Sequence, residues 1–153
     1  GDVVVGNMGS DQRFDYTCLG DAVNLSSRLE GQTKEYRVGI IVGEETTKGI
    51  EDRFNFVELD KIAVKGKKEG VRIFTILDDT SRCANGGDVK HHNTFLSFYR
   101  KQHWNRALKM IDLNEITYPE LKGYYEMMRE RIKTLKVNRP GKGWDTIYRA
   151  TSK

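Results

Sequence analysis

Cysteine and long hydrophobic runs are both scarce in this chain of 153 residues. The two cysteines, Cys18 and Cys83, lie far apart and match no metal-ligand spacing, which indicates reduced thiols rather than a disulfide framework. We expect Cys18 to be a small buried residue on a strand. No stretch of about 18 apolar residues occurs, and the first residues lack the basic and apolar regions of a secretion signal. These absences exclude a disulfide-rich domain and a membrane-spanning helix.

Charge is plentiful and nearly balanced, with 26 Lys and Arg against 22 Asp and Glu and a formal net charge of +4. Such a mild excess is compatible with anionic small molecules and too weak to indicate nucleic-acid binding. Charged residues make up 31% and hydrophobic residues 37% of the chain, which is typical of a globular protein. We expect one ordinary domain, or a smaller core with an appendage.

Residues 13–30 predict a short strand, a glycine turn and a helix that Asp21 is placed to cap. Asn24 and Arg28 follow on one side of this helix, because residues four apart are neighbours on a helix surface. The neighbouring face carries small and apolar residues that can pack on a sheet: Ala22, Leu25, Ser26 and Leu29. The helix is therefore expected to bury one side and to present an amide and a guanidinium near a cleft, together with Thr17 from the strand end.

The rest of the first half predicts further strands. Residues 3–5 are expected to pair with residues 14–18 as a hairpin. The loop between them contains Gly-x-x-Gly, a weak phosphate-binding signal, so a simple hairpin connection is preferred. The helix from Asp21 is expected to end near residues 31–34. The remaining expected elements are a strand at 38–42, a brief helix at 44–50 and paired strands at 54–64 and 70–77.

The second half changes character after a polar, glycine-bearing linker at residues 78–88, within which we place a boundary. Residues 95–111 resemble one tetratricopeptide helix pair, but no second copy follows, so a docking helical hairpin is preferred. A long helix is expected at 119–136 and an extended tail at 144–151. The aromatic residues of this half are expected in the core, whereas the histidines His91, His92 and His103 are expected to be solvated rather than metal-bound.

The basic connection at residues 65–69 allows two interpretations. Its lysines can form a solvated hairpin tip, where lysines usually lie. Alternatively, one of them reaches a polyphosphate as a flexible point charge. The spacing alone favours the hairpin tip.

Three segments together resemble the second half of a class III nucleotidyl cyclase catalytic domain: residues 1–10, 15–30 and 64–67. They occur in the order and at the separations of that family. Residues 89–153 resemble, more loosely, the helical tail of many bacterial membrane-bound adenylate cyclases. The resemblance implies an α+β fold, with a truncated ferredoxin-like cyclase half-domain at 1–79, a linker at 80–88 and an α-helical C-terminal extension at 89–153.

The resemblance also implies a reaction, in which the 3′-hydroxyl of ATP attacks the α-phosphorus and pyrophosphate leaves. Arg28 matches the family's transition-state arginine, and Asn24 matches the asparagine that orients the ribose. Lys65 matches the lysine that contacts the outer phosphates, which reverses the preference for a hairpin tip. Thr17 stands where many cyclases carry an aspartate that reads adenine, and the threonine resembles a bacterial subgroup that still prefers ATP.

The family binds two metal ions, Mg²⁺ or Mn²⁺, through two aspartates in the first half of its domain, which this sequence does not contain. We do not reassign Asp2, Asp15 or Asp21 to that role. The chain alone is therefore expected to bind no metal and to make no cyclic AMP. The missing half is expected to leave an open sheet edge and an uncovered helix face, and therefore to give a homodimer or a rearranged fold. The chain is expected in the cytoplasmic part of a parent protein at the inner membrane.

Other functions stay open at this point. The chain can be a degenerate, cyclase-like regulatory module whose helical tail binds a partner. Guanylate cyclase activity also stays open, because the lysine that would work with Thr17 in reading the base lies upstream of residue 1. Nucleic-acid binding is a distant third possibility.

Overall fold

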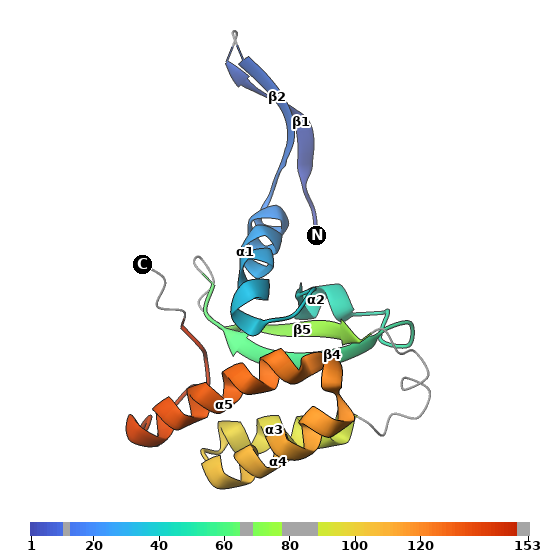
Figure 1. Ribbon diagram of the computed structural model, residues 1–153. Helices are drawn as coiled ribbons and strands as arrows, with labels where there is room; N and C mark the ends of the chain where they lie inside the picture. Colours follow the sequence, from blue (N-terminus) through green and yellow to red (C-terminus); the bar gives the residue numbers. More distant parts are fainter. Residues whose placement is uncertain (11–12, 65–68, 78–88, 150–153) are drawn as a thin grey trace.

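The computed structural model describes residues 1–10, 13–64, 69–77 and 89–149 (Figure 1). The elements before the predicted linker are β1 Val4–Ser10, β2 Arg13–Leu19, α1 Asp21–Tyr36, β3 Val42–Gly43, α2 Glu44–Thr47, β4 Asn55–Ile62 and β5 Val71–Leu77. Those after it are α3 Val89–Arg100, α4 Trp104–Thr117, the short 3-10 helix η2 Pro119–Leu121 and α5 Lys122–Val137. The α+β fold class with a helical C-terminal extension is confirmed.

The first two strands form an antiparallel hairpin that projects beyond the N-terminal end of α1 (Figure 1). Val4 pairs with Leu19 and Gly6 with Thr17, which confirms the predicted hairpin. Several of its apolar side chains are exposed, including Val4 at 67% and Tyr16 at 75%. Cys18 is exposed as well, so the expectation of a buried thiol is wrong. The reason is that the described residues place no other layer over this hairpin.

The helix α1 is longer than predicted and is capped differently. It continues past residues 31–34 to Tyr36 because Tyr36 is fully buried, so tertiary packing outweighs the weak helix propensity of Gly31. Arg37 then takes a left-handed conformation, with φ 54°, and ends the helix. At the other end Gly20 is the N-cap and Asp21 is the first helical residue, so the predicted cap by Asp21 is wrong.

A second, three-stranded antiparallel sheet has the order β3-β5-β4. The paired strands β4 and β5 and the brief helix α2 confirm three predicted elements. The predicted strand at 38–42 is wrong in extent, because only Val42 and Gly43 pair with β5 and Ile40 is 53% exposed.

An irregularity in β4 places two carboxylates in the interior. The register with β5 shifts between Glu58 and Asp60, so Leu59 is an extra residue of a β-bulge. Four consecutive side chains, from Val57 to Asp60, are buried, whereas a regular half-buried strand would alternate. The bulge therefore directs two acidic side chains, Glu58 and Asp60, toward the helical extension.

The helices α3, α4 and α5 lie on the far side of this sheet from the hairpin (Figure 1). One hydrophobic core joins sheet residues such as Val57 and Ile73 to helix residues such as Phe95, Tyr124 and Met128. The expectation that the aromatic residues of this half are core residues is confirmed. The proposed boundary at 80–88 lies outside the described residues and stays a prediction.

The segment after α5 returns to the sheet in extended form. Tyr148 donates its backbone N–H to the Lys61 carbonyl at 2.8 Å and accepts the Ala63 N–H at 2.9 Å. The predicted extended tail is therefore confirmed where it is described. No helix among the described residues is both long and apolar enough to cross a membrane.

His92 is fully buried, so the expectation of a solvated side chain is wrong for this residue. Its Nε2 lies 2.6 Å from the Glu58 carbonyl oxygen, and its Nδ1 lies 2.7 Å from the Tyr125 hydroxyl. Because a carbonyl only accepts, Nε2 carries the proton and Nδ1 accepts from the tyrosine. Burial lowers the pKa of His92 to about 4, so the ring is neutral in the folded protein.

We predict that stability falls as the pH is lowered from about 6.5 to about 4, because unfolded His92 takes up a proton in this range and folded His92 does not. The loss attributable to this side chain is about 3 kcal/mol. Urea unfolding at several pH values measures it. His92→Gln should remove most of this pH dependence, whereas His91→Gln, at an exposed neighbour, should keep it. An unchanged pH dependence in His92→Gln would contradict the assignment.

Candidate functional site

The polar face of α1 carries Asn24 and Arg28, both exposed and one helical turn apart. The backbone N–H of Asn24 donates to the Gly20 carbonyl at 3.1 Å, so the hydrogen-bonding pattern of the helix begins at its N-cap residue Gly20. Leu29, at 3% exposure, packs another side of the helix into the core. The arrangement presents an amide and a guanidinium together to solvent from a helix fixed on its other side, as the spacing predicts.

The other two predicted site residues are not on this helix. Thr17 is on β2, exposed and opposite Gly6 in the hairpin. Lys65 lies outside the described residues, so its predicted contact with phosphates stays a prediction. The structure thus brings Asn24 and Arg28 together and places Thr17 on a neighbouring element, without testing the role assigned to any of them.

A cleft of about 880 Å³ adjoins the other face of α1. The helix lines it with the small and apolar residues predicted to face a sheet: Ala22, Leu25, Ser26 and Leu29. The opposite wall comes from residues 39–46 and 69–71. Neither Asn24 nor Arg28 is among its described lining residues, so this cleft and the polar face of α1 are separate features.

Among the described residues, no three His, Cys, Asp or Glu side chains come close enough together to hold a metal ion. Asp2 and Asp21 both line the cleft beside α1, and four glutamates line it as well, but the described acidic side chains do not converge into a metal-binding group. We assign no metal site among the described residues and derive no step of a reaction through a metal.

The C-terminal end of α1 is held by a buried polar network that the sequence did not reveal. Tyr36 donates its hydroxyl to Asp60 Oδ2 at 2.8 Å, and the Lys61 backbone N–H donates to Asp60 Oδ1 at 2.8 Å. Arg131 of α5 forms an ion pair with the same carboxylate. Its guanidinium carbon lies 3.7 Å from the centre of the Tyr148 ring, a cation–π contact. Four separate segments therefore meet at Asp60.

Burial and neighbouring charges act in opposite directions on the pKa values of the charged groups in this network. Burial raises the pKa of the Asp60 carboxyl, and the Arg131 guanidinium and the Tyr36 hydroxyl act against that rise. Burial also raises the pKa of Tyr36, which keeps its hydroxyl protonated and able to donate. Although burial disfavours a charged guanidinium, the Asp60 carboxylate raises the pKa of Arg131. We assign the pair as ionised on the strength of the hydrogen bonds that converge on the carboxylate.

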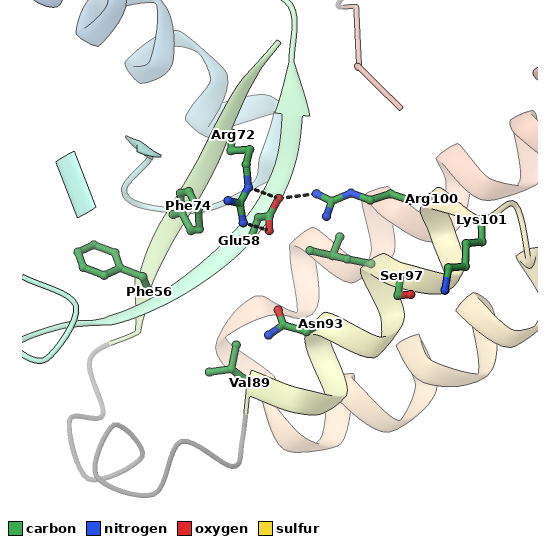
Figure 2. Close-up of a pocket in the computed structure, with 10 residues that line it drawn as sticks. Phe56, Glu58, Arg72, Phe74, Val89, Asn93, Ser97, Arg100 and Lys101 are labelled. Carbon is green, nitrogen blue, oxygen red and sulfur yellow. Dashed lines mark hydrogen bonds and ion pairs between the residues drawn. The ribbon is translucent and has the colours of Figure 1, made fainter. Parts of the chain in front are cut away.

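The ion pair and hydrogen bonds at Asp60 form one joint between the sheet and the helical extension. Glu58 and its ion pairs form the second joint (Figure 2). Arg72 of β5 and Arg100 of α3 both form ion pairs with its carboxylate, and Arg72 also reaches Glu44 of α2. Burial opposes the charge on Glu58, but the two guanidiniums hold its pKa below the ordinary value. A cavity of about 520 Å³ lies over this joint, between the sheet and α3.

Neither joint is predictable from the local sequence of β4. Glu58 and Asp60 stand two apart in a strand that is otherwise largely apolar. Such alternation usually marks the solvent face of a half-buried strand, so it gives no hint that a helix with an arginine covers each carboxylate. The partners, Arg100 and Arg131, are distant in sequence and carry no recognisable spacing.

The family of the adenylate and guanylate cyclase catalytic domain matches this chain over residues 1–78, just over half of its length. The chain belongs to this family. The match covers the hairpin, α1 and the three-stranded sheet, and so includes Asn24 and Arg28.

Individual relatives extend this result. The terminal-differentiation specific adenylate cyclase of Dictyostelium discoideum is 30% identical over 146 residues, which cover 90% of this chain and 7% of that protein. An adenylate cyclase of Anabaena cylindrica is 39% identical over 79 residues, covering 50% of this chain and 16% of that protein. The chain thus spans a small part of these curated relatives. The Dictyostelium match is too long to lie in the cyclase segment alone, so it includes much of the helical extension.

A solved structure is also similar in sequence. The adenylyl cyclase CyaB from P. aeruginosa is 38% identical over a region covering 50% of this chain and 38% of that chain, with a TM-score of 0.43. This region is comparable in extent to the cyclase family match.

We predict that Arg131→Met lowers the free energy of unfolding by about 3 to 5 kcal/mol, because it leaves the buried Asp60 carboxylate without its positive partner. Arg129→Met removes two more exposed ion pairs on the same helix and should cost about 1 kcal/mol or less. Urea unfolding compares them. The double variant Asp60→Asn with Arg131→Met should recover part of the loss. Equal losses for Arg131→Met and Arg129→Met would contradict the role of the pair.

Proposed function

We propose that this chain supplies the nucleotide-positioning part of an adenylate cyclase, which converts ATP to cyclic AMP and pyrophosphate. Family membership supports a cyclase, and the relatives named above are adenylate cyclases by name. The observation that carries the proposal is the pair Asn24 and Arg28, presented together on the exposed face of a helix whose far end is fixed.

The proposed reaction forms a bond between the ribose 3′-oxygen and the α-phosphorus of ATP and breaks the bond from that phosphorus to the β-phosphate oxygen. The 3′-hydroxyl loses its proton to water, and pyrophosphate leaves with the bonding electron pair. Negative charge grows on the α-phosphoryl oxygens and on the leaving group. Such a displacement depends on positioning and charge stabilisation rather than on a protein nucleophile.

Each side chain has a proposed role in this reaction. Arg28 donates hydrogen bonds to the α-phosphoryl oxygens, because a guanidinium offers paired donors that suit a phosphoryl group. Asn24, one turn earlier, holds the ribose so that its 3′-oxygen faces the phosphorus. Thr17 contacts the base through its hydroxyl, and Lys65 contacts the outer phosphates. The helix supplies both of the groups that act closest to the reacting atoms.

The remaining parts of the site are proposed to come from elsewhere. The described residues do not form a metal site, so we propose that Mg²⁺ or Mn²⁺ is held by residues of a further cyclase segment. We also propose that a second copy of the cyclase domain completes the site as a homodimer. On this proposal the chain on its own makes no cyclic AMP, and the exposed apolar hairpin is covered in the assembled enzyme.

We predict that Arg28→Ala, assayed in the complete catalytic domain, lowers kcat by about 100-fold to 1000-fold with little change in the KM for ATP. The reason is that the charge it stabilises is greatest in the transition state. Steady-state cyclic AMP production with ATP measures both constants, and circular dichroism checks that α1 is retained. Lys34→Ala, at another exposed cation on the same helix, should leave kcat within about twofold.

Two results would contradict parts of this proposal separately. A loss of kcat in Arg28→Ala no larger than in Lys34→Ala would contradict the role of Arg28. Production of cyclic GMP from GTP, in preference to cyclic AMP from ATP, would keep the cyclase assignment and contradict the choice of substrate.

A further inference from the structure

Positive charge is concentrated at one end of the helical extension. Residues 100–111 carry four Lys or Arg, and residues 131–144 carry five, and neither stretch contains an Asp or Glu. The turn between α3 and α4 and the C-terminal end of α5 lie at the same end of the helical layer (Figure 1). The two acid-free stretches are thereby brought together, on the far side of the three-stranded sheet from the hairpin.

A cavity of about 500 Å³ lies at this end, within the usual size range of small-molecule sites. Its charged lining consists of the cations Arg106, Lys136 and Arg139, together with His103. Gln102, Trp104 and Asn105 complete the wall, so the other polar groups are amides and an indole. No acidic side chain is among the described lining residues.

The arginines of the extension divide into two groups. Four of them form ion pairs with carboxylates: Arg100, Arg129, Arg131 and Arg149. The other two, Arg106 and Arg139, have no acidic partner in the described part of the chain. Both line the cavity. Lys136, which joins them, donates to the neutral Asn105 Oδ1 at 3.0 Å.

Three neighbouring cations with no acidic partner among the described residues repel one another, and an anion bound among them would relieve that repulsion. Guanidiniums bind phosphate groups with paired hydrogen bonds, a lysine adds a point charge, and the Gln102 and Asn105 amides can donate further bonds. A multiply charged ligand matches three cations better than a single carboxylate does. We propose that this cavity is a binding site for phosphate groups.

The site is distinct from the proposed catalytic face, because Asn24 and Arg28 belong to α1. Its ligand is either a soluble phosphate-bearing anion or the phosphate headgroup of an acidic lipid, since both offer the same chemistry. The proposal does not depend on cyclase activity and can be tested on the chain itself.

The test uses two probes, pyrophosphate in solution and vesicles of phosphatidylcholine with and without phosphatidic acid. Titration calorimetry measures the binding. Tryptophan fluorescence also reports it, because Trp104 lines the cavity and the ring centre of Trp144 lies 5.8 Å from the ring centre of Trp104. Binding of pyrophosphate would identify a soluble phosphate source, and binding of phosphatidic acid vesicles alone would identify a lipid source. Both results support the site.

The deciding variant is Arg106→Gln with Arg139→Gln, compared with Lys109→Gln and Lys122→Gln as a control. Both double variants remove two exposed positive charges from the extension, but only the first removes cavity residues. We expect the first to weaken binding at least about tenfold and the control to change it by less than about twofold. Absence of saturable binding to either probe, or equal losses in the two double variants, would overturn the proposal. If the first variant is poorly folded, the loss of binding in Lys136→Gln tests the same site.

Discussion

Two buried carboxylates on β4, Glu58 and Asp60, each need a positive partner, and the helical extension supplies one to both. Arg100 of α3 reaches Glu58, and Arg131 of α5 reaches Asp60. Removing a carboxylate from water is expensive unless it is paired and hydrogen-bonded. The β-bulge that buries both groups is therefore compatible with a stable fold because the extension covers it. His92 and Tyr124 reinforce this by bonding the backbone carbonyls of Glu58 and Leu59.

The joint at Asp60 also fixes the helix that carries the candidate site. Tyr36, the last residue of α1, donates to Asp60, and the Arg131 guanidinium lies 5.3 Å from the centre of the Tyr36 ring. Asn24 and Arg28 lie two to three turns earlier on the same helix. Any force that shifts the extension relative to β4 would therefore act on the C-terminal end of α1.

Much of this fold followed from local pattern. The hairpin, α1, the β4–β5 pair and the helices of the extension were predicted because periodicity and turn residues are local properties. The pair Asn24 and Arg28 followed from helical spacing alone. The errors at Cys18 and His92 arose because burial depends on which layers cover an element. The strand at β3 was overestimated because its length depends on how far β5 pairs with it.

The two joints lay beyond sequence reasoning for a related reason. Acidic residues that alternate with apolar ones indicate an exposed strand face, and nothing near Glu58 or Asp60 in the sequence points to Arg100 or Arg131. The bulge at Leu59 has no sequence signal that we recognise. Long-range ion pairs of this kind become visible when the elements are placed in space.

The buried carboxylates of β4 and their arginine partners join the cyclase segment and the helical extension into one cooperative unit. Both tryptophans, Trp104 and Trp144, belong to the extension, so their fluorescence in urea follows its unfolding. Hydrogen exchange of the β4 and β5 amides over the same urea range follows the sheet. Both signals are therefore expected to change in a single transition with the same midpoint. Loss of protection in β4 and β5 at urea concentrations where the tryptophan signal is still native would contradict it.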